Sequence, residues 1–169
     1  AYATLLAEQN QHAGAITVYE QNLLRLREKG DKSGVAMTLN NLGNLYQNTQ
    51  RFQEGEASYQ EALTIYRDLA KAKPQAYLSA VAMTLNNLGL LYSGTQRFQE
   101  GEASYQEALT TYRDLAKANP PAYLPYVATT LNNLGALYRD TQRLDAAEKS
   151  YQEALTIRRD LAKANPPAY

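Results

Sequence analysis

A block of 46 residues recurs along this chain of 169 residues, and it restricts the fold more strongly than any other sequence feature. The string Leu-Asn-Asn-Leu-Gly begins at Leu39 and returns twice at 46-residue steps, and Tyr-Gln-Glu-Ala-Leu-Thr does the same from Tyr59. Residues 36–81 and 82–127 differ at only 8 of their 46 positions. Such a period predicts an array in which each unit stacks on its sequence neighbours.

We expect one array over residues 1–169, with three clear repeats and a weaker copy before them. The bounds of the clear repeats are 36–81, 82–127 and 128–169, and residues 1–30 form a degenerate or clipped repeat. In that first copy Tyr19 aligns with Tyr59 at a spacing of 40 residues, so residues 1–9 would be a clipped or degenerate first helix.

Each clear repeat is predicted to be a pair of helices. In the first repeat, Leu39, Leu42 and Tyr46 are spaced by three and four residues, which places them on one helical face. This first helix is expected over about 35–48, a turn over 49–51, and the second helix over about 53–71. His12 is expected in a turn, which makes it a solvated residue rather than a catalyst.

Glycine and proline mark the expected ends of these helices. Gly30 is typical of a left-handed helix end, and Asp31 or Ser33 can cap the helix that follows. Pro74 is expected to end the second helix, because proline lacks an amide donor and disfavours helix before it. Pro125 is expected within a first helical turn, where proline is tolerated.

The motif Leu-Gly-x-x-Tyr, followed by an aromatic residue, a small residue, an aromatic residue and an alanine, resembles the tetratricopeptide repeat. The matching residues in the first clear repeat are Leu39, Leu42, Gly43, Tyr46, Phe52, Gly55, Tyr59 and Ala62. The usual repeat has about 34 residues, so the second helix and linker are expected to take up the surplus. The long repeat is most similar to the kinesin light chain type. Arg67 stands where the family has proline.

The resemblance implies an all-α fold, a right-handed α-solenoid of antiparallel helix pairs forming a tetratricopeptide-like superhelix. It also implies that the first helices line a concave groove. The expected function is a scaffold that binds an extended peptide or partner segment in this groove, and the alternative is a structural spacer or self-association module with an inert groove.

A ladder of asparagines suggests how such a segment could be held. Asparagine is a poor helix former, yet pairs recur in the middle of each first helix. A side-chain amide offers donors and an acceptor together, so it can bond to a peptide backbone; alternatively, one asparagine of each pair bonds to the adjacent repeat. The candidate peptide-binding residues are Asn40, Asn41, Asn44, Gln47, Met83, Asn86, Asn87, Leu90, Asn132, Asn133 and Arg139.

Two of these positions, and that of Asn48 on the same side, vary between otherwise similar copies. Such variation is what a ligand-reading surface would show, although exposed positions also drift. Asn44 becomes Leu90 and then Ala136, and Gln47 becomes Ser93 and then Arg139. With Arg139 alone basic, a clamp for a terminal carboxylate is disfavoured. Met83 and Leu90 instead suggest an apolar pocket for an anchoring side chain.

Composition argues against several other functions. The 17 Lys and Arg residues balance the 17 Asp and Glu residues, so no nucleic-acid or membrane partner is expected. There is no cysteine, only one histidine and no phosphate-binding loop, and we therefore expect neither enzymatic activity nor a cofactor or metal. Without a signal peptide or an apolar span, a cytoplasmic location is the default.

The end of the array suggests a further contact. Arrays need polar caps, but residues 164–169 match an inter-repeat linker rather than a capping helix. Leu155 and Leu161 are therefore expected on an open apolar side, which could support self-association through the uncapped C-terminal repeat.

Overall fold

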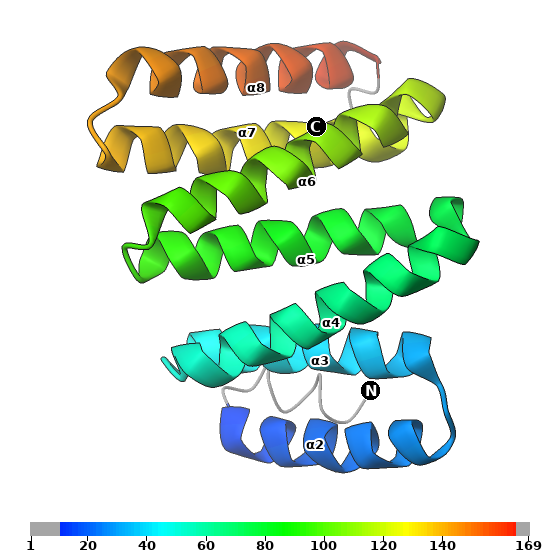
Figure 1. Ribbon diagram of the computed structural model, residues 1–169. Coiled ribbons are helices and arrows are strands. Elements are labelled where there is room, and N and C mark those ends of the chain that lie inside the picture. Colours follow the sequence, from blue (N-terminus) through cyan, green and yellow to red (C-terminus); the bar gives the residue numbers. More distant parts are fainter. Residues whose placement is uncertain (1–10, 165–169) are drawn as a thin grey trace. The chain divides into compact units, whose positions relative to one another are not determined.

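The computed structural model describes residues 11–164, and these residues form helices joined by short turns (Figure 1). In chain order the helices are α2 (His12–Glu28), α3 (Lys32–Asn48), α4 (Phe52–Ala72), α5 (Pro74–Gly94), α6 (Phe98–Ala118), α7 (Pro120–Asp140) and α8 (Leu144–Ala164). The expected all-α architecture is confirmed for this part of the chain, which contains no strand. The clipped helix expected over residues 1–9 lies outside the described residues.

The chain divides into two compact units, residues 1–91 and 92–169, with the boundary inside α5. In the first unit α3 packs against both α2 and α4, and in the second unit α7 packs against both α6 and α8. The core of each unit is built by the repeated residues: Leu39 and Leu42 are buried in the first, and Leu131 and Leu134 in the second.

Close packing within a helix pair depends on the repeated glycine. A Cβ atom added to Gly43 would collide with the ring of Tyr59, which is fully buried in the facing helix. A Cβ atom on Gly135 would lie 2.7 Å from Cε1 of Tyr151. Only glycine lets the two helices approach this closely, which explains why it accompanies the tyrosine in each clear copy.

The turns inside the helix pairs share one conformation. Gln50, Gln96 and Gln142 have φ values of 60°, 61° and 59°, in the left-handed region that non-glycine residues seldom occupy. Each follows a threonine whose backbone N–H or side chain bonds to the preceding helix, as Thr49 does to Leu45. Nothing in the residue type of glutamine indicated this geometry.

The connections between pairs differ from the expectation. Only Lys73 separates α4 from α5, and Pro74 is the first residue of α5 rather than the stop of an extended linker. Proline fits there because the first N–H groups of a helix have no intrahelical partner. The surplus residues of the long repeat therefore lengthen the first helix as well as the second, to 21 residues each in α5 and α6.

Other helix ends confirm or correct the sequence interpretation. Gly30 has a φ of 67°, and the side chain of Asp31 accepts a 2.9 Å hydrogen bond from the N–H of Gly34, so both predictions are confirmed. Pro125 lies inside α7 instead of in its first turn, because that helix already begins at Pro120. His12 is the first residue of α2 and not part of a turn.

Candidate functional site

One face of α3 is exposed along the length of the helix. Met37, Asn41, Asn44 and Asn48 are spaced by four, three and four residues, and none of them is buried. Met37 has 58% of its surface exposed, which is high for a large apolar residue. The opposite face carries the buried residues of the helix pair, so this exposed row is the side that the sequence analysis placed toward the groove.

The equivalent row on α5 has an apolar character. Met83 and Leu90 are 40% and 41% exposed, and Asn87 lies half-buried between them. The side chain of Asn87 donates a 3.4 Å hydrogen bond to the amide oxygen of Asn40 on α3. This bond joins α3 to α5 within the first unit, and we call their two exposed rows together the α3–α5 wall.

The position predicted for Asn40 is wrong. Asn40 is only 3% exposed, so it does not reach the open wall, and its amide oxygen is occupied by Asn87. A one-residue step turns a helical side chain by about 100°, which separates Asn40 from the half-exposed Asn41. In this pair the first asparagine, Asn40, therefore bonds to the adjacent repeat, which was the alternative to ligand binding. Only the second, Asn41, is accessible to a ligand.

Two residues of α3 that vary between repeats, Asn44 and Gln47, are hydrogen-bonded to a buried tyrosine of α4. The hydroxyl of Tyr59 donates a 2.6 Å hydrogen bond to the amide oxygen of Asn44 and a 3.3 Å bond to the side-chain oxygen of Gln47. Burial raises the pKa of the Tyr59 hydroxyl above its usual value, because the phenolate would be poorly solvated there. The bond turns the oxygen of the exposed Asn44 amide inward and fixes the orientation of its NH₂ group.

The corresponding face of α7 lies in the second unit. Asn132 is exposed, whereas Asn133, like Asn86 on α5, is half-buried. Arg139, the one basic candidate, has an ion pair of 2.8 Å with its neighbour Asp140. This pair offsets the positive charge of Arg139 at the end of α7.

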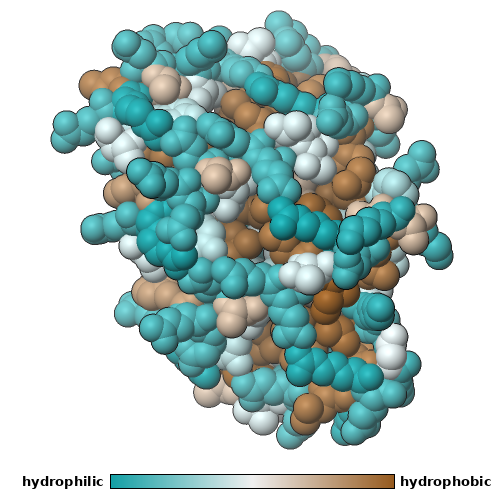
Figure 2. All heavy atoms as spheres, viewed as in Figure 1, coloured by the Kyte–Doolittle hydropathy of each residue, from teal (hydrophilic) through white to brown (hydrophobic). Residues whose placement is uncertain are grey.

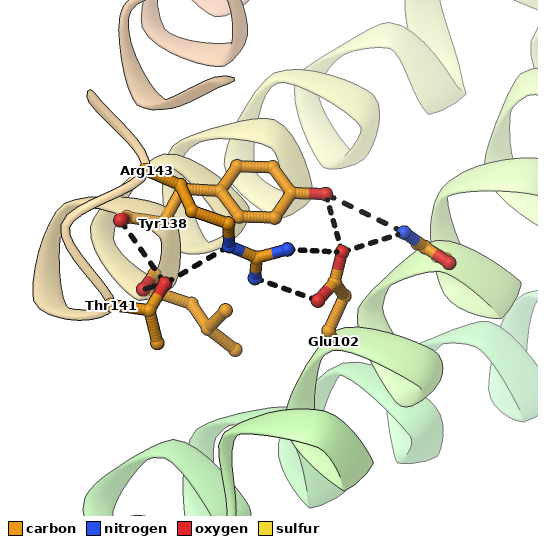
Figure 3. Close-up of polar contacts among 6 residues, drawn as sticks. Glu102, Tyr138, Thr141 and Arg143 are labelled. Carbon is orange, nitrogen blue, oxygen red and sulfur yellow. Dashed lines mark hydrogen bonds and ion pairs between the residues drawn. The ribbon is translucent and has the colours of Figure 1, made fainter. Parts of the chain in front are cut away.

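A polar cluster that was not predicted from the sequence lies at the turn between α7 and α8 (Figure 3). The guanidinium of Arg143 lies 4.4 Å from the ring centroid of Tyr138 and bonds to both carboxylate oxygens of Glu102, at 2.7 and 3.2 Å. The hydroxyl of Tyr138 also donates to Glu102, and the hydrogen bond from Arg143 holds the pKa of Glu102 below its usual range.

The spacing of tyrosine and arginine in the repeats could have predicted this cluster. An arginine follows the tyrosine of each clear repeat by five residues, and in all three cases its guanidinium lies over the ring, as Arg51 does over Tyr46. Tyr46 also donates a 2.7 Å bond to Glu20 of α2. The cluster ties the first-helix end of one pair to the preceding second helix, which indicates a role in stacking.

The comparisons with known proteins agree with this geometry. The profile of the tetratricopeptide repeat matches residues 1–68 and 80–160, which is most of the chain. The chain belongs to the tetratricopeptide repeat family. The crystal structure of BtubC (BKLC) from P. vanneervenii, a kinesin-light-chain-like tetratricopeptide protein, is similar with a TM-score of 0.81 and 25% identity. That match covers 95% of this chain and 61% of BtubC, so this chain spans under two thirds of the length of that protein.

A second tetratricopeptide-like structure, the MamA RS-1 ArsTM double mutant, matches with a TM-score of 0.60 and 19% identity over 94% of this chain and 72% of that one. This likeness concerns the fold alone. No curated protein matches the sequence. Together the comparisons confirm the predicted family and the all-α, solenoid class of fold, and tetratricopeptide repeats generally mediate protein interactions.

Two cavities in the described part of the chain lie away from the α3–α5 wall. One of about 610 Å³ lies at the turn edge of the second unit, beside the Arg143 cluster, and one of about 340 Å³ lies between Arg27 and Asp68 in the first unit. Figure 2 shows a mostly hydrophilic face with apolar residues exposed between the polar ones.

Over residues 11–164, no cluster of three or more histidine, aspartate or glutamate residues could hold a metal ion. Within the same range, no helix combines the length and the apolar character that crossing a membrane requires.

At α8 the expected open side is found only in part. Leu155 is 47% exposed, whereas Leu109, the equivalent residue of α6, is 7% exposed. The expectation is wrong for Leu161, which is 8% exposed. Arg158 replaces the tyrosine found at position 112, so α8 also carries a charge where α6 buries a ring.

Proposed function

We propose that this chain is a protein-interaction scaffold that holds an extended polypeptide segment against the exposed faces of its first helices. The observation that carries the proposal is the exposure of Met37, Met83 and Leu90 on the α3–α5 wall. Exposed apolar residues gathered on one surface mark interaction sites more often than scattered ones do. On this wall they alternate with side-chain amides, which gives the surface both apolar area and hydrogen-bonding groups.

The amides supply what an extended backbone needs. Asn41 and Asn44 lie on the same face of α3. The amide of Asn41 can donate to a peptide C=O and accept from a peptide N–H, whereas Asn44, whose oxygen is bonded to Tyr59, offers its NH₂ group as a donor. The Tyr59 bond restrains Asn44 before any ligand arrives, so less rotamer freedom is lost on binding. In this proposal Asn40 and Gln47 stabilise the wall through their bonds to Asn87 and Tyr59. Asn87 both belongs to the wall and links α5 to α3.

The second unit would extend the same function along the array of repeats 36–81, 82–127 and 128–169. Asn132 and Asn133 on α7 are the proposed counterparts of Asn40 and Asn41 on α3. On α5, Asn86 is the counterpart of Asn40. The paired Arg139 adds no net charge with Asp140. The balanced charge of the chain favours a protein partner over nucleic acid, and a cytoplasmic protein without catalytic activity or cofactor remains part of the proposal.

The test begins with a displayed library of random linear peptides, from which peptides that bind the wild-type chain are selected. The affinity of a selected peptide is then measured by fluorescence anisotropy for the wild type and for Leu90→Asp. We expect Leu90→Asp to weaken binding about tenfold, equivalent to about 1.4 kcal/mol, because it replaces exposed apolar area with an unpaired charge.

The matched control is Leu24→Asp, which places the same charge at a leucine of α2 that is 61% exposed and away from the wall. It is expected to bind like the wild type, and circular dichroism should show both variants folded. The proposal fails if no peptide is selected, or if the two variants affect binding equally.

Self-association is a second candidate, favoured by the exposure of Leu155 on α8. It predicts a concentration-dependent increase in sedimentation coefficient that Leu155→Glu removes. A chain that stays monomeric over the accessible concentration range would rule this candidate out.

A further inference from the structure

The first helices of the repeats carry no charged residue over long stretches. The uncharged stretches are residues 33–50, 74–96 and 120–138, whereas the chain as a whole has 34 charged residues (17 + 17). In the described part of the chain the charges are concentrated on the second helices and the turns. For α4 these include Glu61, Arg67, Asp68 and Lys71, all exposed.

Burial does not explain the difference. Met37 on α3 and Met83 on α5 are 58% and 40% exposed, and Asn44 is exposed as well. A lysine or glutamate could occupy such positions without desolvation, as charged residues do on α4. Both helix types are otherwise packed in the same pairs, so the absence of charge from the wall is a property of that surface rather than a consequence of packing.

An uncharged wall restricts the ligand that it can bind. A charged side chain pressed against it would lose water without gaining a counter-ion, and such desolvation is costly. An aliphatic side chain would instead gain free energy by removing its apolar surface from water against the exposed methionines and leucine. Methionine adapts its shape easily to such side chains, and two methionines and a leucine present their apolar surface here.

Leu90 is larger and more apolar than the residues at the equivalent positions of the other repeats, which favours an apolar ligand side chain beside it. The same helical position holds Asn44 in the preceding repeat and Ala136 in the following one. Leu90 therefore offers more apolar surface than either, one helical turn from Asn87 and two turns from Met83.

We propose that the α3–α5 wall selects an uncharged segment of a partner protein, with an aliphatic side chain seated between Met83 and Leu90, and that it rejects acidic and basic segments. This inference rests on the function proposed above and adds the chemistry of the ligand. The selecting residue is Leu90, with the amides of Asn41 and Asn44 holding the backbone of the segment.

The probe is again the peptide selected from the random library, together with two synthetic versions in which its central aliphatic residue is replaced by glutamate or by lysine. We expect each replacement to lower the affinity about tenfold or more. Affinity for the parent peptide should change less than about twofold between low and high salt, since few charges are involved. The variant Leu90→Lys should bind the glutamate version more tightly than the lysine version.

The outcomes separate the two proposals. If selected peptides share acidic or basic residues and bind less tightly at high salt, while Leu90→Asp still weakens them, groove binding stands and the uncharged specificity is overturned. If Leu90→Asp has no effect on any selected peptide, the proposed function itself fails. If the chain forms dimers that Leu90→Asp dissociates, the occupant is a second copy and the partner segment is ruled out.

Discussion

The hydroxyl of Tyr59, fully buried on α4, donates a 2.6 Å hydrogen bond to the amide oxygen of Asn44 on the exposed face of α3. The bond joins the interior of the helix pair to the surface that we propose for ligand binding. The position of Asn44 holds Leu90 in the next copy, where Ser93 is the residue that lies near the Tyr105 hydroxyl.

The Tyr59–Asn44 bond predicts a measurable coupling. Asn44→Ala should lower the free energy of unfolding by about 1 kcal/mol, because the buried hydroxyl keeps only its longer bond to Gln47. In a double-mutant cycle with Tyr59→Phe, we expect a coupling of about 0.5–1.5 kcal/mol from urea denaturation. Strictly additive single effects would show that the bond contributes nothing to stability.

Alanine substitutions of the two paired asparagines on α3 should have opposite effects: one should lower stability and the other should weaken peptide binding. Asn40→Ala is expected to cost about 1–3 kcal/mol of unfolding free energy, because it removes a buried amide that is bonded to Asn87. Asn41→Ala should leave stability unchanged or slightly higher, since alanine is the better helix former, and should weaken peptide binding. Thermal unfolding and peptide titration of both variants check this contrast, which equal losses of stability would contradict.

The close approach at the repeated glycine can be tested by adding one methyl group. Gly43→Ala should destabilise the chain by about 1–3 kcal/mol, because the Cβ atom would strike the ring of Tyr59 and force the helices apart. The matched control is Gly94→Ala, where an added Cβ meets nothing within 4 Å. Urea denaturation should show no loss for the control, and a neutral Gly43→Ala would disprove the steric argument.

Stability should fall in alkaline solution. Burial and the hydrogen bond to Glu20 raise the pKa of Tyr46 to about 12, whereas a tyrosine in the unfolded chain titrates near about 10. The folded chain then holds more protons than the unfolded chain between these values, so the free energy of unfolding falls as pH rises from about 10 to 12. Urea denaturation across this range should show a shallower fall for Tyr46→Phe, and an unchanged slope would exclude Tyr46 as a contributor.

Much of the fold could be predicted because its determinants are local and repeated. The spacing of Leu39, Leu42 and Tyr46 identifies the buried face of a helix without knowledge of its partner. The helix ends at Asn48 and near Ala72 were placed within about two residues. The connection at Pro74 was misjudged because proline both stops one helix and starts another, and the choice depends on how the next helix packs.

The candidate site also combines features that local sequence predicts with features that depend on packing. The amino-acid pattern alone is enough for the period, the helix pairs and the row of residues opposite each packed face, because these follow from about 3.6 residues per turn. The folded chain is needed to see that Asn40 is buried against Asn87 while Asn41 remains accessible, and that Arg143 reaches Glu102. Those contacts join helices that are distant in sequence, so their partners depend on how neighbouring helices stack.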